Sequence, residues 1–318
     1  MPYAKRALFV AAAVSSAVFA CSSDPVENRF GTDGGTAGGE LPDTGLSLGG
    51  EPAKEDTACK KMDLLFVIDN SGSMGEEQAN LKTNFPKFVD ILNKFKTKSG
   101  DPIDYRIAVT TTGVTAHIVT SFGGFDQVGD DGKFRTTSGM SRAWLERTDT
   151  KITTLFQSIA NVGTSGPSYE MPLEGGRLAL RDRLKDSNAG FVRDDALLGV
   201  VYMTDEEDCS TALRTIGTSS TPIGTSCAST VEATSKYISY FDTLKQGRAR
   251  WATAVIAGPT ACTSAFGDAV AAPRLKAFVA EVGKTAVFSS ICDGDLAGAL
   301  TKALNTFDAA CQNFEVPR

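Results

Sequence analysis

The sequence is poor in the groups on which many enzymes and nucleic-acid-binding proteins depend. Its 318 residues include a single histidine, His117, so only this residue could serve as the base of a Ser–His–Asp catalytic set. Lys and Arg form no cluster and the formal net charge is -6, which argues against a nucleic acid or an anionic membrane surface as the main partner. We therefore expect a protein that is not an enzyme and that binds no nucleic acid.

Long apolar runs are missing beyond residue 21, so no later segment is long enough to span a bilayer. Residues 1–20 combine a short basic start with an apolar stretch, which is typical of an export signal peptide. Cys21 follows, and Val-Phe-Ala-Cys resembles a bacterial lipoprotein box. We expect a lipidated Cys21 to be the only membrane contact of an envelope protein, either periplasmic or surface-exposed. Ordinary cleavage after Ala20, with secretion, is the alternative.

The rest of the chain divides into a tether and a domain. Residues 21–56 are rich in Gly, with Pro, Ser, Thr and acidic residues between, which predicts a flexible tether. Residues 57–318 are expected to form one domain, because 42% of the chain is hydrophobic and can supply a sizeable core. We predict insertions near 121–150, where little regular structure is expected, and near 206–230.

Cysteine occurs seven times but never as a C-x-x-C pair, which disfavours a cysteine metal site. After Cys21, the remaining cysteines are even in number and suit three disulfides in an exported chain. Sequence alone permits many connectivities. The predicted element order favours three pairs, each expected on one side of the sheet: Cys59–Cys311, Cys209–Cys227 and Cys262–Cys292.

Two apolar runs end in carboxylates. Residues 64–68 lead directly into Asp69, and residues 197–204 lead into Asp205. Such runs predict central parallel strands covered on both faces, whose carboxyl ends open onto the crevice where these sheets bind ligands. Asp69 and Asp205 are therefore expected to face one crevice.

Strand and helix patterns alternate along the domain, which predicts an α/β fold with a doubly wound, mostly parallel sheet and helices on both faces. Val114–Thr120 is predicted to turn back beside strand 105–110 as one antiparallel edge strand. The other expected strands are 64–68, 197–204, 251–257 and 286–288, and the expected helices lie near 81–95, 152–160, 173–184, 231–244, 273–283 and 296–307.

The turn after the first strand has the pattern Asp-x-Ser-x-Ser over residues 69–73. With the element order of about residues 56–318, it resembles the metal-ion-dependent adhesion site of the von Willebrand factor type A domain. The resemblance implies that Ser71 and Ser73 bind a metal directly and that Asp69 and Asp205 act mainly through bound waters. It also implies a threonine ligand, for which Thr164 is the nearest match. The alternative is a plain turn in which Ser73 caps the next helix and Glu76 completes a capping box.

The implied donors are all oxygen atoms, which suits Mg²⁺ or Mn²⁺, with Ca²⁺ as the alternative, and disfavours zinc. Two features depart from the family. The loop that contains Thr164 is long, so Glu170 is an alternative ligand, and a loop without a ligand is another. Glu206 stands where the family usually has glycine; residues 206–208 are expected to be a solvated loop, with a second cation as the alternative.

The resemblance implies a binding module displayed on the cell envelope, in which an acidic side chain of a partner protein completes the open metal position. One alternative is an envelope scaffold in which the metal only stabilises the fold. A metal-assisted hydrolase is the other. His117 lies on the predicted edge strand, away from the strand ends, so we expect it to be structural or exposed.

Overall fold

The computed structural model describes residues 59–97, 99–217, 227, 230–265, 267–294 and 296–314, all within one unit, Glu51–Arg318. The predicted signal peptide, Cys21 and the tether lie outside the described residues. Within the described part of the chain, no helix has the length and apolarity needed to cross a membrane.

A six-stranded sheet forms the centre of the domain, with the strand order β11-β8-β6-β1-β2-β5. The first five of these strands are parallel, and β5 runs antiparallel to β2 at the edge. The predicted fold class is therefore confirmed. The strands are β1 (Lys61–Ile68), β2 (Asp104–Thr111), β5 (Leu145–Glu146), β6 (Leu197–Met203), β8 (Trp251–Ala257) and β11 (Ala286–Ser290).

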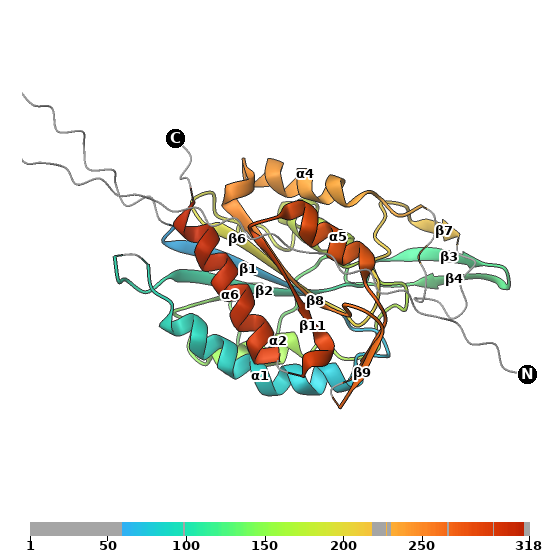
Figure 1. Ribbon diagram of the computed structural model, residues 1–318, viewed down its shortest axis with the longest axis horizontal. Coiled ribbons are helices and arrows are strands. Elements are labelled where there is room, and N and C mark those ends of the chain that lie inside the picture. The colour runs from blue at the N-terminus through green and yellow to red at the C-terminus, as the bar shows by residue number, and fades with distance from the viewer. Residues whose placement is uncertain are drawn as a thin grey trace, which may run out of the picture. The chain divides into compact units, whose positions relative to one another are not determined.

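Helices cover both faces of the sheet (Figure 1). Side chains of β1 alternate between two cores, as the period of a strand requires. Phe66 packs with α1 (Gly75–Lys94), α2 (Ile152–Ala160) and α6 (Leu296–Gln312). Val67 packs on the other face with α3 (Pro172–Arg181), α4 (Thr234–Leu244) and α5 (Pro273–Val282). Burial on both faces explains why residues 64–68 of β1 are continuously apolar.

Several predicted boundaries agree with the structure. The predicted helix 152–160 is α2, and the predicted strand 251–257 is β8. Pro273 begins α5 and Gly283, with a φ of 83°, follows its end, which is a conformation that glycine adopts without strain. Three short 3-10 helices complete the helical elements of the described residues: η1 (Arg183–Lys185), η2 (Arg248–Arg250) and η3 (Ile291–Asp293).

The predicted antiparallel edge strand was assigned to the wrong segment. β3 (Ala116–Thr120) does not turn back beside β2; it pairs with β4 (Gly123–Gln127) and β7 (Thr215–Gly217) in a separate sheet, beyond the main one in Figure 1. Because the connection between β3 and β4 is short, closing this hairpin costs little conformational entropy. The edge position belongs to β5, so residues 121–150 hold two strands, β4 and β5, where little regular structure was expected.

All three predicted disulfides are present. The Cα atoms of Cys59 and Cys311 lie 5.1 Å apart, so the start of β1 is joined to the end of α6. The corresponding distances are 5.0 Å for Cys209–Cys227 and 6.3 Å for Cys262–Cys292. The last bond links η3 to a hairpin formed by β9 (Cys262–Ser264) and β10 (Gly267–Ala269), next to the site described below.

Candidate metal-binding site

The parallel strands β1, β2 and β6 end at the same edge of the sheet. Ile68, the last residue of β1, is in register with the last residues of both neighbours. The next backbone groups continue the pattern: the Asp69 N–H donates to the Met203 carbonyl (2.9 Å), and the Thr112 N–H donates to the Ile68 carbonyl (3.2 Å). Side chains that follow these strands are thereby brought together above the sheet.

Asp69 is fully buried and organises the Asp-x-Ser-x-Ser turn. Its Oδ1 accepts from the Ser71 N–H (2.8 Å), and its Oδ2 accepts from the Thr204 hydroxyl (2.5 Å). The Ser71 and Ser73 hydroxyl oxygens lie 3.0 Å apart, with Ser71 buried and Ser73 exposed. Burial raises the pKa of Asp69, although these hydrogen bonds oppose the shift.

The alternative interpretation of this turn as a simple helix cap is wrong. Helix α1 has Met74 at its N-cap position, and no side chain accepts a capping hydrogen bond there. Met74 and the following residues are held by backbone bonds instead, for example from the Gln78 N–H to the Met74 carbonyl (2.9 Å). The Ser73 hydroxyl is not used for capping, so it can serve the site.

Asp205, at the end of β6, joins the same cluster. Its side chain is buried, and its Oδ1 has no hydrogen-bond partner among the described residues. Burial and the nearby Asp69 raise the pKa of Asp205 to about 7, while a hydrogen bond with Ser73 opposes the shift. The structure therefore brings together four of the five predicted site residues, Asp69, Ser71, Ser73 and Asp205.

Thr164 occupies a different position. It is exposed, in the loop between α2 and α3. The loop does approach the Asp-x-Ser-x-Ser turn, because the Gly166 N–H donates to the Asn70 carbonyl (2.7 Å). Within the described part of the chain, no hydrogen bond joins Thr164 to another site residue, and its role as a ligand stays a prediction.

Glu170, the alternative ligand, is fully buried beside Asp69. One carboxylate oxygen, Oε2, accepts from the Thr112 hydroxyl, and the other, Oε1, has no partner among the described residues. Burial raises the pKa of Glu170 well above its ordinary value, and the charges of Asp69, Glu206 and Asp205 add to the shift.

The acidic run after Asp205 divides into two parts. Glu206 faces the site: burial, Asp69 and Asp205 raise its pKa to about 8. Glu207 and Asp208 turn to α5 instead, where Glu207 accepts from the Arg274 N–H (2.9 Å) and Asp208 forms an ion pair with the Arg274 side chain (2.6 Å). The expected solvated loop is therefore wrong: Asp208 is fully buried and paired with Arg274, and Glu206 and Glu207 are half-buried.

Glu77 is a member of this region that the sequence did not reveal. It lies in the first turn of α1, is buried, and has a buried Oε2 without a partner among the described residues. Burial raises its pKa to about 7, with contributions from Glu76, Asp268 and Asp69. Its position three residues after Met74, where acids commonly favour a helix start, gave no signal of burial.

The buried carboxylates of the described residues fall into two groups. Asp63, Glu174 and Asp208 each form an ion pair with arginine. The second group is Asp69, Glu77, Glu170 and Asp205, and none of these appears in an ion pair between described residues. A buried charge without a partner is costly. The site therefore has the electrostatic character of one completed by a cation.

The donors present fit a hard metal ion. No group of three or more His, Cys, Asp or Glu side chains in the described ranges is arranged to hold a metal by itself. A cation here would therefore need the hydroxyl oxygens of Ser71 and Ser73 beside the carboxylates. Such an oxygen-only set suits Mg²⁺, Mn²⁺ or Ca²⁺.

The site opens onto a cleft of about 390 Å³. Ser73, Asp205 and Glu206 line it together with residues of the disulfide-linked β9–β10 hairpin, including Asp268. A partner side chain can therefore reach the predicted metal position from solvent.

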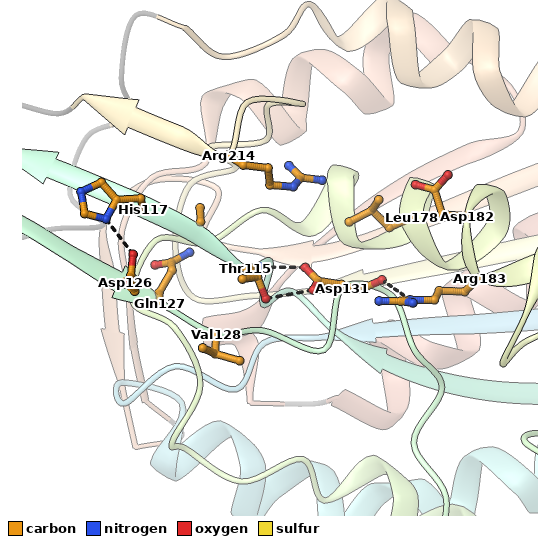
Figure 2. Close-up of a pocket in the computed structure, with 11 residues that line it drawn as sticks. Thr115, His117, Asp126, Gln127, Val128, Asp131, Leu178, Asp182, Arg183 and Arg214 are labelled. Atoms are coloured by element: carbon orange, nitrogen blue, oxygen red, sulfur yellow. Dashed lines mark hydrogen bonds and ion pairs between the residues drawn. The ribbon is translucent and has the colours of Figure 1, made fainter.

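A larger cleft, of about 640 Å³, lies by the small sheet and is shown in Figure 2. Two pairs of its polar groups bond to each other: His117 Nδ1 lies 2.7 Å from Asp126, and the Thr115 hydroxyl donates to Asp131 (2.9 Å). His117 is exposed on β3, as expected. None of the predicted metal ligands lines this cleft.

No family model and no curated protein matches the chain. Several solved structures match the chain. The chain is similar to von Willebrand factor type A proteins. One is proximal thread matrix protein 1 of the mussel byssus, with a zinc-occupied MIDAS motif, at 14% identity and a TM-score of 0.41, covering 80% of this chain and 47% of that chain. This chain thus spans about half the length of that protein.

Two further structures have similar levels of likeness. The pilus adhesin SpaC of Lactobacillus rhamnosus GG is 11% identical with a TM-score of 0.40, over 78% of this chain and 31% of that chain. The manganese-loaded TRAP protein of Plasmodium vivax is 14% identical with a TM-score of 0.34, over 77% of this chain and 74% of that chain.

Proposed function

We propose that the chain is a metal-dependent protein-binding module. The observation that carries this proposal is the group of buried carboxylates Asp69, Glu77, Glu170 and Asp205. Among the described residues this group has no arginine or lysine partner, although the other buried carboxylates have one. A divalent cation would neutralise them. Ser71, Ser73, Asp69 and Asp205 would hold it, with Thr164 as a further donor.

The cation would provide a positive centre with one coordination position open to the cleft. Mg²⁺ or Mn²⁺ suits hydroxyl and carboxylate oxygens, and Ca²⁺ is the alternative. The chain's own residues orient the donors: Thr204 and the Ser71 N–H hold Asp69, and the Ser71 and Ser73 hydroxyls lie together above it.

We propose an acidic side chain of a partner protein as the group that completes the open position. The rim of the cleft carries Glu206 and Asp268, so the partner should present its Glu or Asp within a neutral or basic surround. We assign no catalytic role to His117, the single histidine, which is exposed and lies beside Asp126.

The proposed location is the outside of the cell or its envelope. Three disulfides suit an oxidising compartment, and the sequence before the domain supports export with a lipid on Cys21.

Calorimetric titration with Mg²⁺ and Mn²⁺ tests the metal, with the exported chain compared with its Asp69→Ala variant. We expect binding by the wild type and none by the variant. Asp126→Ala is the matched control, because it removes an exposed carboxylate away from the site and should leave the affinity unchanged. A wild-type chain that binds no divalent cation contradicts the proposal.

Retention of envelope proteins on the immobilised chain tests the partner. A chelator should release the partner, and added Mg²⁺ or Mn²⁺ should restore its binding. A partner that stays bound in excess chelator and also binds Ser73→Ala with unchanged affinity would favour the scaffold alternative.

A further inference from the structure

Glu170 is held in place by the ends of two central strands. Its carbonyl accepts from the Cys209 N–H (2.9 Å), beyond β6, and the next residue, Met171, donates its N–H to the Thr112 carbonyl (3.3 Å), beyond β2. Both sequence neighbours, Tyr169 and Met171, are buried in the small core beneath the second sheet. The backbone therefore gives this side chain a defined position.

The Glu170 carboxylate is directed to the site rather than to the core. Oε2 accepts from the Thr112 hydroxyl, and the carboxyl group lies beside that of Asp69. Oε1 is buried without a partner among the described residues. Two buried acidic groups lie side by side, and neither forms an ion pair with a lysine or arginine of the described residues, so their position favours a cation.

We infer that Glu170 is a direct ligand of the cation, in the role for which the sequence pattern indicated Thr164, and that it makes this a calcium site. The inference rests on the proposed function, because it concerns the same cation. Thr164 is exposed and Glu170 is buried against Asp69.

The preference for Ca²⁺ follows from the donors. With Glu170 the site offers the carboxylates of Asp69, Glu170 and Asp205 beside two serine hydroxyls. Ca²⁺ accepts six to eight oxygen ligands, including bidentate carboxylates, and its affinity rises with the number of charged ligands. Mg²⁺ prefers to keep several waters and usually binds only one or two carboxylates. A carboxylate-rich site therefore favours the larger ion.

Calorimetric titration of the exported chain with CaCl₂, MgCl₂ and MnCl₂ tests the inference. We expect the wild type to bind Ca²⁺ more tightly than Mg²⁺, and Glu170→Gln to weaken Ca²⁺ binding by about tenfold or more, since even residues that only support a ligand commonly cost that much. Gln keeps the size of the side chain and an acceptor for the Thr112 hydroxyl. Thr164→Ala should lose less affinity than Glu170→Gln, and Asp126→Asn should lose none.

The Asp69→Ala variant distinguishes a failure of this inference from a failure of the proposed function. If the wild type binds a cation and Asp69→Ala does not, but Glu170→Gln keeps the wild-type Ca²⁺ affinity, Glu170 is not a ligand and the proposed function stands. A wild type that prefers Mg²⁺ also overturns the inference. If the wild type binds no cation at all, both proposals fail.

The second readout is thermal unfolding with and without Ca²⁺. The rise in melting temperature on adding Ca²⁺ should be large for the wild type and small for Glu170→Gln. Should Glu170→Gln not fold, Thr112→Val removes only the hydroxyl that orients Glu170, and it should also reduce the Ca²⁺ affinity. An unchanged affinity in a folded Thr112→Val variant overturns the inference in that case.

Discussion

Asp69 and Thr204 are 135 positions apart in the sequence, yet the Thr204 hydroxyl donates a 2.5 Å hydrogen bond to Asp69 Oδ2. Each is the first residue after a central strand, and the parallel pairing of β1 with β6 places the two strand ends side by side. Thr204 therefore holds the carboxylate that organises the Asp-x-Ser-x-Ser turn. The sequence pattern did not reveal this role for Thr204.

We expect Thr204→Val to destabilise the domain, because it leaves a buried carboxylate oxygen of Asp69 without its donor. The cost should be about 1–3 kcal/mol in the free energy of unfolding, measured by urea titration in chelator. Cation affinity should also fall. Thr83→Ala is the control, since it removes only an exposed hydrogen bond to the Ala79 carbonyl, and its effect should stay within about 0.5 kcal/mol. Equal stability of both variants would contradict the orienting role of Thr204.

Stability without a cation should fall as the pH rises. The folded-state pKa values of Asp205 and Glu77 are raised to about 7 and that of Glu206 to about 8, from ordinary values of 3.8, 4.5 and 4.5. Between the ordinary and the raised values the unfolded chain loses protons that the folded chain keeps, so the unfolded state is favoured progressively.

The measurement is the melting temperature in chelator at about pH 5 and about pH 8, repeated with saturating divalent cation. We expect a lower melting temperature at the higher pH in chelator, and a smaller decrease with the cation, because the cation binds the ionised carboxylates. A melting temperature that rises with pH in chelator would show that the ionised carboxylates do not destabilise the folded domain when no cation is bound.

Arg274→Met should destabilise the domain strongly. It leaves Asp208 fully buried without the guanidinium that lies 2.6 Å away, and breaking a buried ion pair from one side costs about 3–5 kcal/mol. Urea unfolding measures the loss. The double variant Arg274→Met, Asp208→Asn should recover part of it, because the unpaired charge is then absent. No recovery would mean that the packing of Arg274, rather than its charge, is what matters.

The predicted lipid anchor is tested separately from the domain. If Cys21 is acylated, the mature protein should partition with membranes or detergent, and Cys21→Ala should release it or block its processing. Mass spectrometry of the amino terminus is the direct measurement. Fully soluble wild-type protein with an unmodified Cys21 would establish ordinary secretion.

Local sequence was sufficient for the central strands and for much of the site. Residues 64–68 are continuously apolar because both faces of β1 are buried, and this signal is contained in consecutive residues. Asp69 and Asp205 could be placed at one edge because parallel strands end together. The three disulfides followed from which cysteines lie on the same side of such a sheet.

Tertiary structure alone decided which strand closes the edge and which carboxylates are neutralised. β5 has only two residues, too few for a periodic pattern, and its pairing with β2 depends on the chain returning from the separate hairpin. Asp208 and Glu170 are both acidic residues in loops, yet Asp208 meets Arg274, 66 positions away, whereas Glu170 meets Asp69 and Thr112. The charge around a buried carboxylate comes from elements distant in the sequence, so no local pattern contains it.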